Sequence, residues 1–148
     1  VASGDLAAVI GLEKVDNPDI VPLIPNAREA GLHALRTRGH YPINHLIVVK
    51  DDLLAAHPRL AADVFDAFVQ AKQDYLTRLA GGAIAAPTDI DRLHQQVMAI
   101  TGDPLPYGIA PNRQVLETLI GQAVGQGIIP ARVTPESLFA AGTHALVG

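Results

Sequence analysis

Apolar residues recur along this chain with two kinds of spacing, and each spacing predicts a kind of secondary structure. Continuous apolar runs at 6–10, 20–24 and 43–49 predict short β-strands. Apolar residues three and four positions apart predict helices, and we expect these over 26–38, 58–80, 88–100 and 112–126, with short helices from Asp51 and Thr134. The chain therefore combines many helices with few strands.

Residues at the ends of these segments predict how the helices begin and end. Asn26 and Glu29 have the spacing of a capping box. Thr88 is a typical N-cap residue, and Gly39 is a typical C-terminal stop. We expect the tail beyond Gly142 to be poorly ordered.

The predicted strands are too few to form a complete sheet. The second half of 43–49 is continuous Leu, Ile and Val, which is typical of a strand covered on both faces. Pro22 makes 20–24 an edge strand or a crossover segment. Since the chain also begins on Val1 without a methionine, we expect it to be the C-terminal part of a longer protein. Some of its apolar surface would then be covered by the absent half or by a second copy.

Composition excludes several classes of protein. The chain has 148 residues, of which 49% are hydrophobic, so intrinsic disorder is excluded. Its net charge is −4, and its 11 basic residues are scattered, so we expect no nucleic-acid partner. No apolar run is long enough to cross a membrane, and no basic amphipathic helix would bind a membrane surface.

The chemistry open to the side chains is also limited. There is no cysteine, which removes disulfides, thiolate nucleophiles and thiolate metal ligands. The six histidines show no metal-ligand spacing, so we expect no metal, and no cofactor motif is present. His45 differs from the other histidines because it lies inside the strongest predicted strand. It is either a buried histidine bonded to a backbone carbonyl or a general acid presented to a cleft.

The loop 102–113 is the second candidate for chemistry. Three prolines lower the entropy cost of holding it in one shape. Tyr107 lies in its middle, and Asn112 and Arg113 lie where a helix begins, a position that favours anions. Arg113 also carries a planar fork suited to a carboxylate. The alternative is a rigid surface connection that packs against its own helix.

Several short motifs in the chain resemble those of a known enzyme family. Asp103-Pro-Leu-Pro-Tyr-Gly108 and the following Asn112-Arg113-x-x-Leu116 are the most specific. Pro42-Ile-x-His45, Gln126-Gly-Ile128 and Glu136-Ser-Leu-Phe139 fit the same family, whereas Leu23-Ile-Pro-Asn26 and Thr37-Arg-Gly39 resemble a segment that the family shares with solute-binding proteins of the same fold. Over nearly the whole chain, this set resembles the 4,5-dihydroxyphthalate decarboxylase family.

The resemblance implies a fold class and a domain arrangement. The fold would be α/β and helix-rich: the C-terminal part of a type 2 periplasmic-binding-protein-like fold with two lobes and few strands. Residues 1–25 would end the second lobe and form the crossover, and 26–148 would supply the C-terminal strand and helices of the first lobe. The N-terminal half of that fold would be absent, so the 148 residues alone would be inactive.

The resemblance also implies a reaction and a set of site residues. A dihydroxylated aromatic dicarboxylate would lose one carboxylate without oxidation, giving protocatechuate and CO2. His45 would donate the proton or bind a hydroxyl group, and Arg113 would anchor the remaining carboxylate. Tyr107, Asn112 and Asn26 would complete the substrate site, although Asn26 alone is better explained as a helix cap. Such an enzyme would be cytoplasmic.

Two other interpretations stay open. A solute-binding protein of the same fold, serving an ABC transporter in the periplasm, would hold a small anionic or aromatic ligand with the same residues and no turnover. A fragment without activity would form a homodimer or a strand-exchanged oligomer in which two copies complete each sheet.

Overall fold

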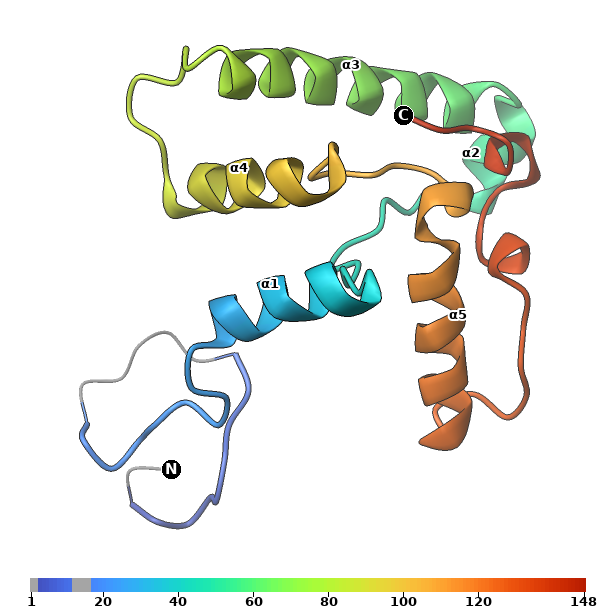
Figure 1. Cartoon of the computed structure of the whole chain (residues 1–148). Helices are drawn as coiled ribbons and strands as arrows, with labels where there is room; N and C mark the ends of the chain where they lie inside the picture. The colour runs from blue at the N-terminus through green and yellow to red at the C-terminus, as the bar shows by residue number, and fades with distance from the viewer. Residues whose placement is uncertain (1–2, 12–16) are drawn as a thin grey trace.

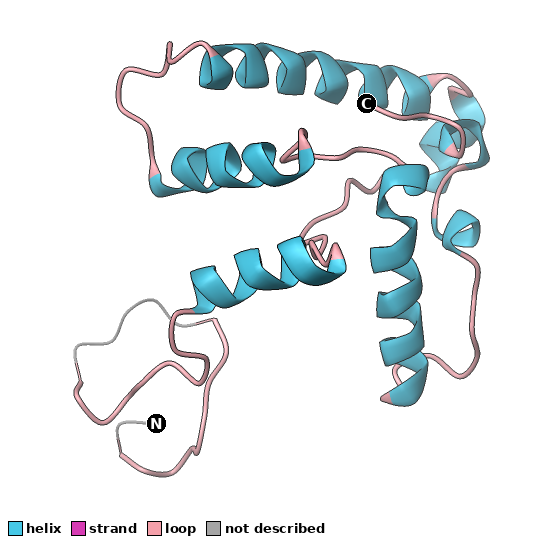
Figure 2. Cartoon of the chain, in the orientation of Figure 1, coloured by secondary structure: helices cyan, strands magenta, loops and turns pink. Residues whose placement is uncertain are grey.

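The computed structural model describes residues 3–11 and 17–148. Within these ranges the chain is helix-rich and forms no β-strand (Figures 1 and 2). The elements are five α-helices and two 3₁₀-helices: α1 (Ala27–Arg38), α2 (Asp51–Ala56), α3 (Leu60–Ala80), α4 (Asp89–Thr101), α5 (Ile109–Gly125), η1 (Pro135–Leu138) and η2 (Ala141–Thr143). The helix periodicity in the sequence therefore predicts the five α-helices correctly, with small shifts at their ends, and the short helix expected from Thr134 is η1; η2 is not predicted.

The three predicted strands are wrong for the described residues. Segments 6–10, 20–24 and 43–49 are irregular, and most of their apolar side chains lie exposed. Ile10, Leu23 and Val48 are 99%, 95% and 90% exposed. A strand forms only when a neighbouring strand accepts its hydrogen bonds, and no such neighbour is present in the described chain. Of the predicted segment 1–25, residues 1–2 and 12–16 lie outside the described ranges.

The helix ends follow the sequence in most places. Thr88 and Asp91 form a complete capping box at α4, and Gly39 ends α1 in the left-handed conformation. The predicted capping box of Asn26 is wrong: Asn26 has φ 54°, and its side chain makes no capping hydrogen bond. The left-handed backbone turns this side chain away from the first turn of α1, where only its carbonyl accepts a bond from Ala30 N–H.

The helices pack in pairs around small apolar contacts. In Figure 1, α3 and α4 run side by side, α1 lies along the other side of α4, and α5 runs across the ends of these helices. Leu32 and Leu35 of α1 are buried against Val97 of α4. On α5, Leu116 and Ile120 are almost fully buried. Burial of these side chains, at about 1.5–3 kcal/mol each, stabilises the helix pairs.

The C-terminal tail is ordered, which corrects the expectation of disorder beyond Gly142. Tyr107 N–H donates to the Gly148 carbonyl over 3.1 Å, and Gly148 N–H donates to the Tyr107 carbonyl over 3.3 Å. Gly108 has φ 103°, and a Cβ atom there would overlap the carbonyl oxygen of Leu146. Glycine at 108 thus allows the tail to lie directly against the loop that precedes α5.

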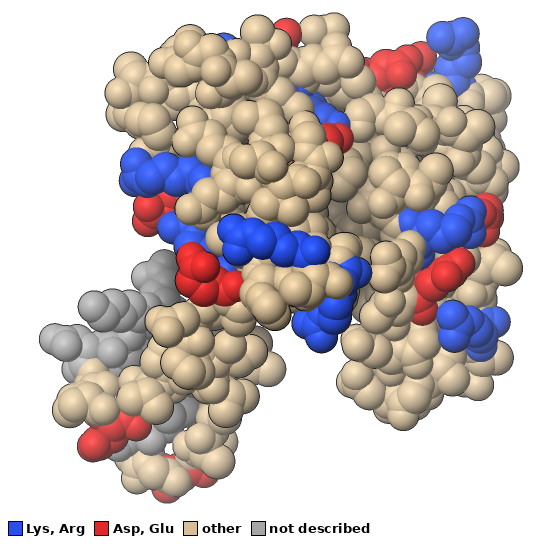
Figure 3. All heavy atoms as spheres, in the orientation of Figure 1, with Lys and Arg blue, Asp and Glu red and all other residues tan. Residues whose placement is uncertain are grey.

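No helix in the described chain is long and apolar enough to span a bilayer. On the face shown in Figure 3, Lys and Arg side chains alternate with acidic ones and are separated by broad uncharged areas. This surface agrees with the scattered charge read from the sequence.

Candidate functional site

The loop between α4 and α5, residues 102–108, is held in place by hydrogen bonds from both of its flanks. Thr101 Oγ1 donates to the Asp103 carbonyl over 2.8 Å, and Asp103 Oδ1 accepts from Leu105 N–H over 2.9 Å. Asn112, which is only 7% exposed, donates from Nδ2 to the carbonyls of Pro106 and Gly108 over 2.8 and 2.9 Å. The loop is therefore a rigid element fixed to the first turn of α5.

This geometry assigns Asn112 a structural contact that the sequence does not reveal. Both amide hydrogens of its side chain are used beneath the loop. A direct bond from that NH2 group to a ligand would require one of these bonds to break. Its part in a substrate site stays a prediction, and the contact present in the structure holds Tyr107 and Gly108 in place.

Tyr107 is half-buried between two side chains of α3. Its ring lies edge-on to Phe65, with centroids 6.4 Å apart, and the Lys72 ammonium lies 5.1 Å from its centroid. The Tyr107 hydroxyl makes no hydrogen bond with any residue that the structure describes. Since no buried side-chain oxygen or nitrogen of these residues lacks a partner, the hydroxyl must reach solvent. No hydrogen bond within the described chain would have to break for this hydroxyl to bond a ligand.

Lys72 is the charged residue that the sequence analysis missed. It is only 7% exposed, and its Nζ lies 2.6 Å from Asp103 Oδ2 and 2.7 Å from the Gly148 carbonyl oxygen. A lysine in the middle of an apolar helix gives no local signal, because its partners come from 31 and 76 positions away. Only the fold brings them together.

The segment that carries His45 begins beside this loop. Tyr41 OH donates to the Pro104 carbonyl over 3.0 Å, and Gln114 Nε2 of α5 donates to the Arg38 carbonyl over 3.4 Å. Two motifs that are 63 positions apart in sequence therefore meet at Tyr41 and Pro104. His45 itself is exposed on 43–49, and its ring makes no hydrogen bond within the described chain. The structure therefore does not show His45 as a buried histidine bonded to a backbone carbonyl.

Arg113 lies on α5 and forms ion pairs with two glutamates. Its guanidinium bonds the Glu136 carboxylate of η1 and lies 3.8 Å from Glu117 Oε1. The hydrogen bond and charge of Glu136 raise the pKa of Arg113, and the same bond lowers the pKa of Glu136. Arg113 therefore already holds a carboxylate of the chain itself, and its predicted role as the anchor of a substrate carboxylate stays a prediction.

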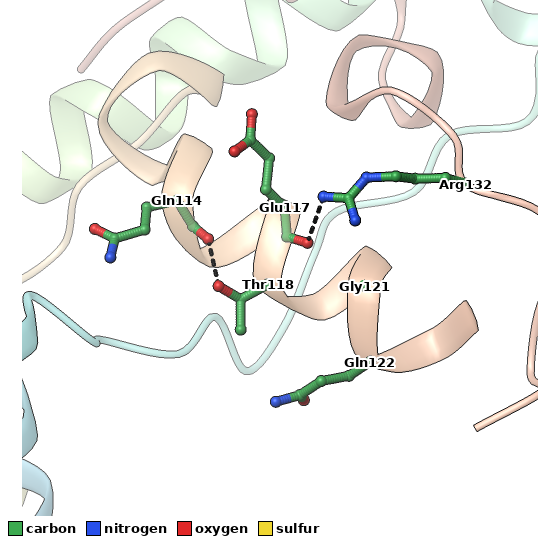
Figure 4. Close-up of a pocket in the computed structure, with 6 residues that line it drawn as sticks. All are labelled: Gln114, Glu117, Thr118, Gly121, Gln122 and Arg132. Atoms are coloured by element: carbon green, nitrogen blue, oxygen red, sulfur yellow. Dashed lines mark hydrogen bonds between the residues drawn. The ribbon is translucent and has the colours of Figure 1, made fainter. Parts of the chain in front are cut away.

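Two shallow hollows lie along α5 near these charges. One, of about 350 Å³, is lined by Arg113, Glu117, Arg132 and Glu136, among others. The other, of about 450 Å³, is lined by six residues, which Figure 4 shows: Gln114, Glu117, Thr118, Gly121, Gln122 and Arg132. Arg132 Nη2 donates to the Glu117 carbonyl over 3.4 Å. A Cβ atom at Gly121 would lie 3.4 Å from Arg132 Nη1. Gly121 thus leaves room for this arginine against the helix.

Asn26 stands apart from these groups. It is exposed at the start of α1, and no side-chain hydrogen bond joins it to Tyr107, Asn112 or Arg113. The structure therefore brings Tyr107 and Asn112 together at the loop, places Arg113 on the next turn with its acidic partner, and leaves Asn26 and His45 exposed.

A polar cluster between α3 and α4 was also missed by the sequence analysis. Tyr75 OH lies 2.8 Å from Asp91 Oδ1 and 2.9 Å from His94 Nδ1. Burial, followed by the Asp91 carboxylate, raises the pKa of Tyr75 to about 12, while bonds from Thr88 and then Tyr75 lower the pKa of Asp91 to about 2. Burial lowers the pKa of His94 despite the nearby Asp91. The cluster joins the two helices and caps α4.

In the described part of the chain, no group of three or more His, Asp or Glu side chains is placed to hold a metal ion. The candidate groups in the structure are the Tyr107 hydroxyl on the loop and the Arg113 guanidinium on α5, while His45 is exposed on 43–49.

Comparison with known proteins adds one similarity. The chain is 26% identical over 147 residues to 4,5-dihydroxyphthalate decarboxylase of Comamonas testosteroni. The match covers 94% of this chain and 44% of that protein, so the chain spans less than half the length of this relative. No family model and no solved structure matches the chain. The predicted resemblance is thus supported as a distant similarity, and the periplasmic-binding-protein-like fold stays a prediction.

Proposed function

We propose that this chain is part of a decarboxylase that acts on a dihydroxylated aromatic dicarboxylate. The observation that carries the proposal is the similarity to 4,5-dihydroxyphthalate decarboxylase along nearly the full chain. The alternative, a solute-binding protein of the same fold, has no observation in its favour of comparable weight.

The chemistry of the reaction makes specific demands on a protein. The bond between the ring and one carboxylate breaks, and CO2 leaves. The electron pair of that bond stays on the ring carbon and forms a new bond to a proton. A general acid must deliver that proton. The remaining carboxylate needs a cation, and the ring hydroxyls need hydrogen-bonding partners.

Residues at the candidate site offer these groups. Tyr107 has a hydroxyl without a partner in the described chain on a rigid loop, which suits a hydrogen bond to a ring hydroxyl. His45 is exposed on 43–49, and an imidazole is a side chain that can act as a general acid. Arg113 already binds a carboxylate, so a substrate carboxylate can replace that of Glu136 at the same guanidinium.

The remaining parts of the site are proposed to come from the rest of a longer protein. The relative is more than twice as long as this chain, and the exposed apolar residues of 43–49 include Leu46, Ile47 and Val48. We propose that these residues join a sheet with strands from that other part, which would bury them and fix the position of His45.

The test is to express the full-length protein that contains this chain and incubate it with 4,5-dihydroxyphthalate. We expect release of CO2 and formation of protocatechuate, with kcat/KM lowered at least about 100-fold in His45→Ala and Arg113→Ala. His33→Ala serves as the matched control, because His33 is an exposed histidine on α1 outside the site, and it should retain activity.

Two results would contradict the proposal: the first would remove the decarboxylase assignment, and the second would remove the roles of His45 and Arg113. Tight binding of the dicarboxylate without turnover would indicate a solute-binding protein. Turnover that survives both substitutions would show that the reaction does not use these residues.

A further inference from the structure

The buried ammonium group of Lys72 joins three separate parts of the chain. It projects from the middle of α3, pairs with Asp103 in the loop at 2.6 Å, and donates to the Gly148 carbonyl of the tail at 2.7 Å. Its side chain is 5% exposed, whereas that of Asp103 is 38% exposed. Taking an ammonium group out of water is costly unless its bonds are replaced, and here both oxygen partners are in place.

The third neighbour of the ammonium group is the face of Tyr107. The 5.1 Å distance from Nζ to the ring centroid is a cation–π contact, and Phe65 lies edge-on to the same ring. The backbone of Tyr107 is paired with Gly148, which is also a partner of Lys72. The ring, its backbone and the adjoining loop are therefore all linked to a single nitrogen atom.

Tyr107 thus combines a fixed ring with a hydroxyl group that has no partner among the described residues. Other tyrosines of the chain use their hydroxyls internally: Tyr41 bonds Pro104, and Tyr75 bonds Asp91. A side chain that is held through its face and backbone while its polar end stays free is arranged to present that end to a ligand.

We propose that Lys72 is a positioning residue that orients Tyr107, so that the phenol hydroxyl bonds a hydroxyl or carboxylate oxygen of an aromatic acid. This inference rests on the proposed function for the chemistry of the ligand. It adds a residue that never touches the substrate and acts only through Tyr107 and Asp103.

The first test is a double-mutant cycle in the full-length protein with 4,5-dihydroxyphthalate. We expect Lys72→Met to raise KM about tenfold with a smaller change in kcat, and Tyr107→Phe to raise KM by a similar factor, since each loses the same hydrogen bond. The double variant should be no worse than Tyr107→Phe alone, because Lys72 acts through that hydroxyl. Lys50→Met, which removes an exposed lysine, is the matched control for loss of one positive charge.

A second test does not depend on turnover. In protein labelled with ¹³C-tyrosine, the Tyr107 ring signals are identified by their loss in Tyr107→Phe. We expect Lys72→Met to shift these signals more than those of Tyr41 or Tyr75, because only Tyr107 loses a cation from its face. If circular dichroism shows that Lys72→Met does not fold, Asp103→Asn takes its place. It keeps the lysine, removes its anionic partner, and should produce the same changes at smaller size.

The outcomes separate this inference from the proposed function. Turnover by the unaltered protein with fully additive effects of the two substitutions would overturn the role of Lys72 and leave the decarboxylase intact. Absence of turnover and of ligand binding would remove the proposed function, and an unmoved Tyr107 signal would then overturn the positioning role independently.

Discussion

The hydroxyl of Tyr41 donates to the Pro104 carbonyl over 3.0 Å and links the segment before His45 to the loop that carries Tyr107. Burial, followed by the Asp103 carboxylate, raises the pKa of Tyr41, so the hydroxyl stays protonated as a donor. This single bond ties together two motifs that are remote in sequence.

Removal of that bond should lower the stability of the fold. We expect Tyr41→Phe to reduce the free energy of unfolding by about 1 kcal/mol, the net value of a typical internal hydrogen bond. Urea unfolding followed by circular dichroism measures it. Tyr107→Phe is the matched control, because its hydroxyl has no partner among the described residues and its loss should change stability little.

The capping box of α4 gives a second prediction. Thr88→Ala removes the acceptor for Asp91 N–H, and we expect a loss of about 1 kcal/mol in unfolding free energy. Thr118→Ala is the control: its hydroxyl bonds the Gln114 carbonyl in the middle of α5, where alanine is the better helix former. An equal loss in both variants would contradict a specific capping effect.

The Asp91 carboxylate should make stability depend on pH in the acid range. Its pKa falls from 3.8 to about 2 in the folded chain, so the ionised form stabilises the fold above the unfolded pKa. This stabilisation is lost as the pH falls from about 4 towards 2. We expect the difference in thermal stability between the unaltered chain and Asp91→Asn to shrink over this window. A difference that stays constant down to pH 2 would refute the assignment.

Burial on α5 distinguishes two leucines of the same helix. Leu116 is 2% exposed, and Leu116→Ala should cost about 2–5 kcal/mol through lost burial and a cavity. Leu119 is 54% exposed, and Leu119→Ala should stay within about 0.5 kcal/mol. Chemical denaturation of both variants measures the contrast, and similar losses would mean that α5 packs through a different face.

The ion pair of Arg113 with Glu136 should compete with substrate. If Arg113 anchors a substrate carboxylate, Glu136→Gln frees the guanidinium and should lower KM for the dicarboxylate about two- to fivefold, as expected for an exposed pair. Glu117→Gln, which removes a carboxylate 3.8 Å from the same arginine, should have a smaller effect. An increase in KM for Glu136→Gln would show that Glu136 supports binding.

The sequence predicts this structure well where the interactions are local along the chain, and poorly where they join residues far apart in sequence. Helix periodicity and the Thr88 cap are local, and they predict α1 to α5 well. The predicted strand at 43–49 needs a partner beyond the described chain, so its apolar pattern alone does not produce a strand. The Asn26 cap fails because backbone conformation, not residue type, decides where that side chain points.

The candidate site shows the same division between features set by local sequence and contacts between residues remote in sequence. The loop predicted over 102–113 is recognisable from its prolines and motifs, but in the structure only residues 102–108 form a hydrogen-bonded connection, and 109–113 belong to α5. The link from Lys72 to Asp103 and Gly148 is invisible in sequence, because it joins residues that only the packing of α3 brings to the loop. Whether Arg113 and His45 act on a substrate stays a prediction.

The run Leu46-Ile-Val-Val49, in which Leu46, Ile47 and Val48 are exposed, has a consequence for handling this chain. It is short, rich in β-branched residues and uncharged, which is the composition of segments that stack into cross-β aggregates. Pro42 on one side and Lys50-Asp51-Asp52 on the other are residues that oppose such stacking. The 148 residues expressed by themselves should therefore tend to aggregate through this window as their concentration rises, and a lysine in place of Val48 should suppress that tendency.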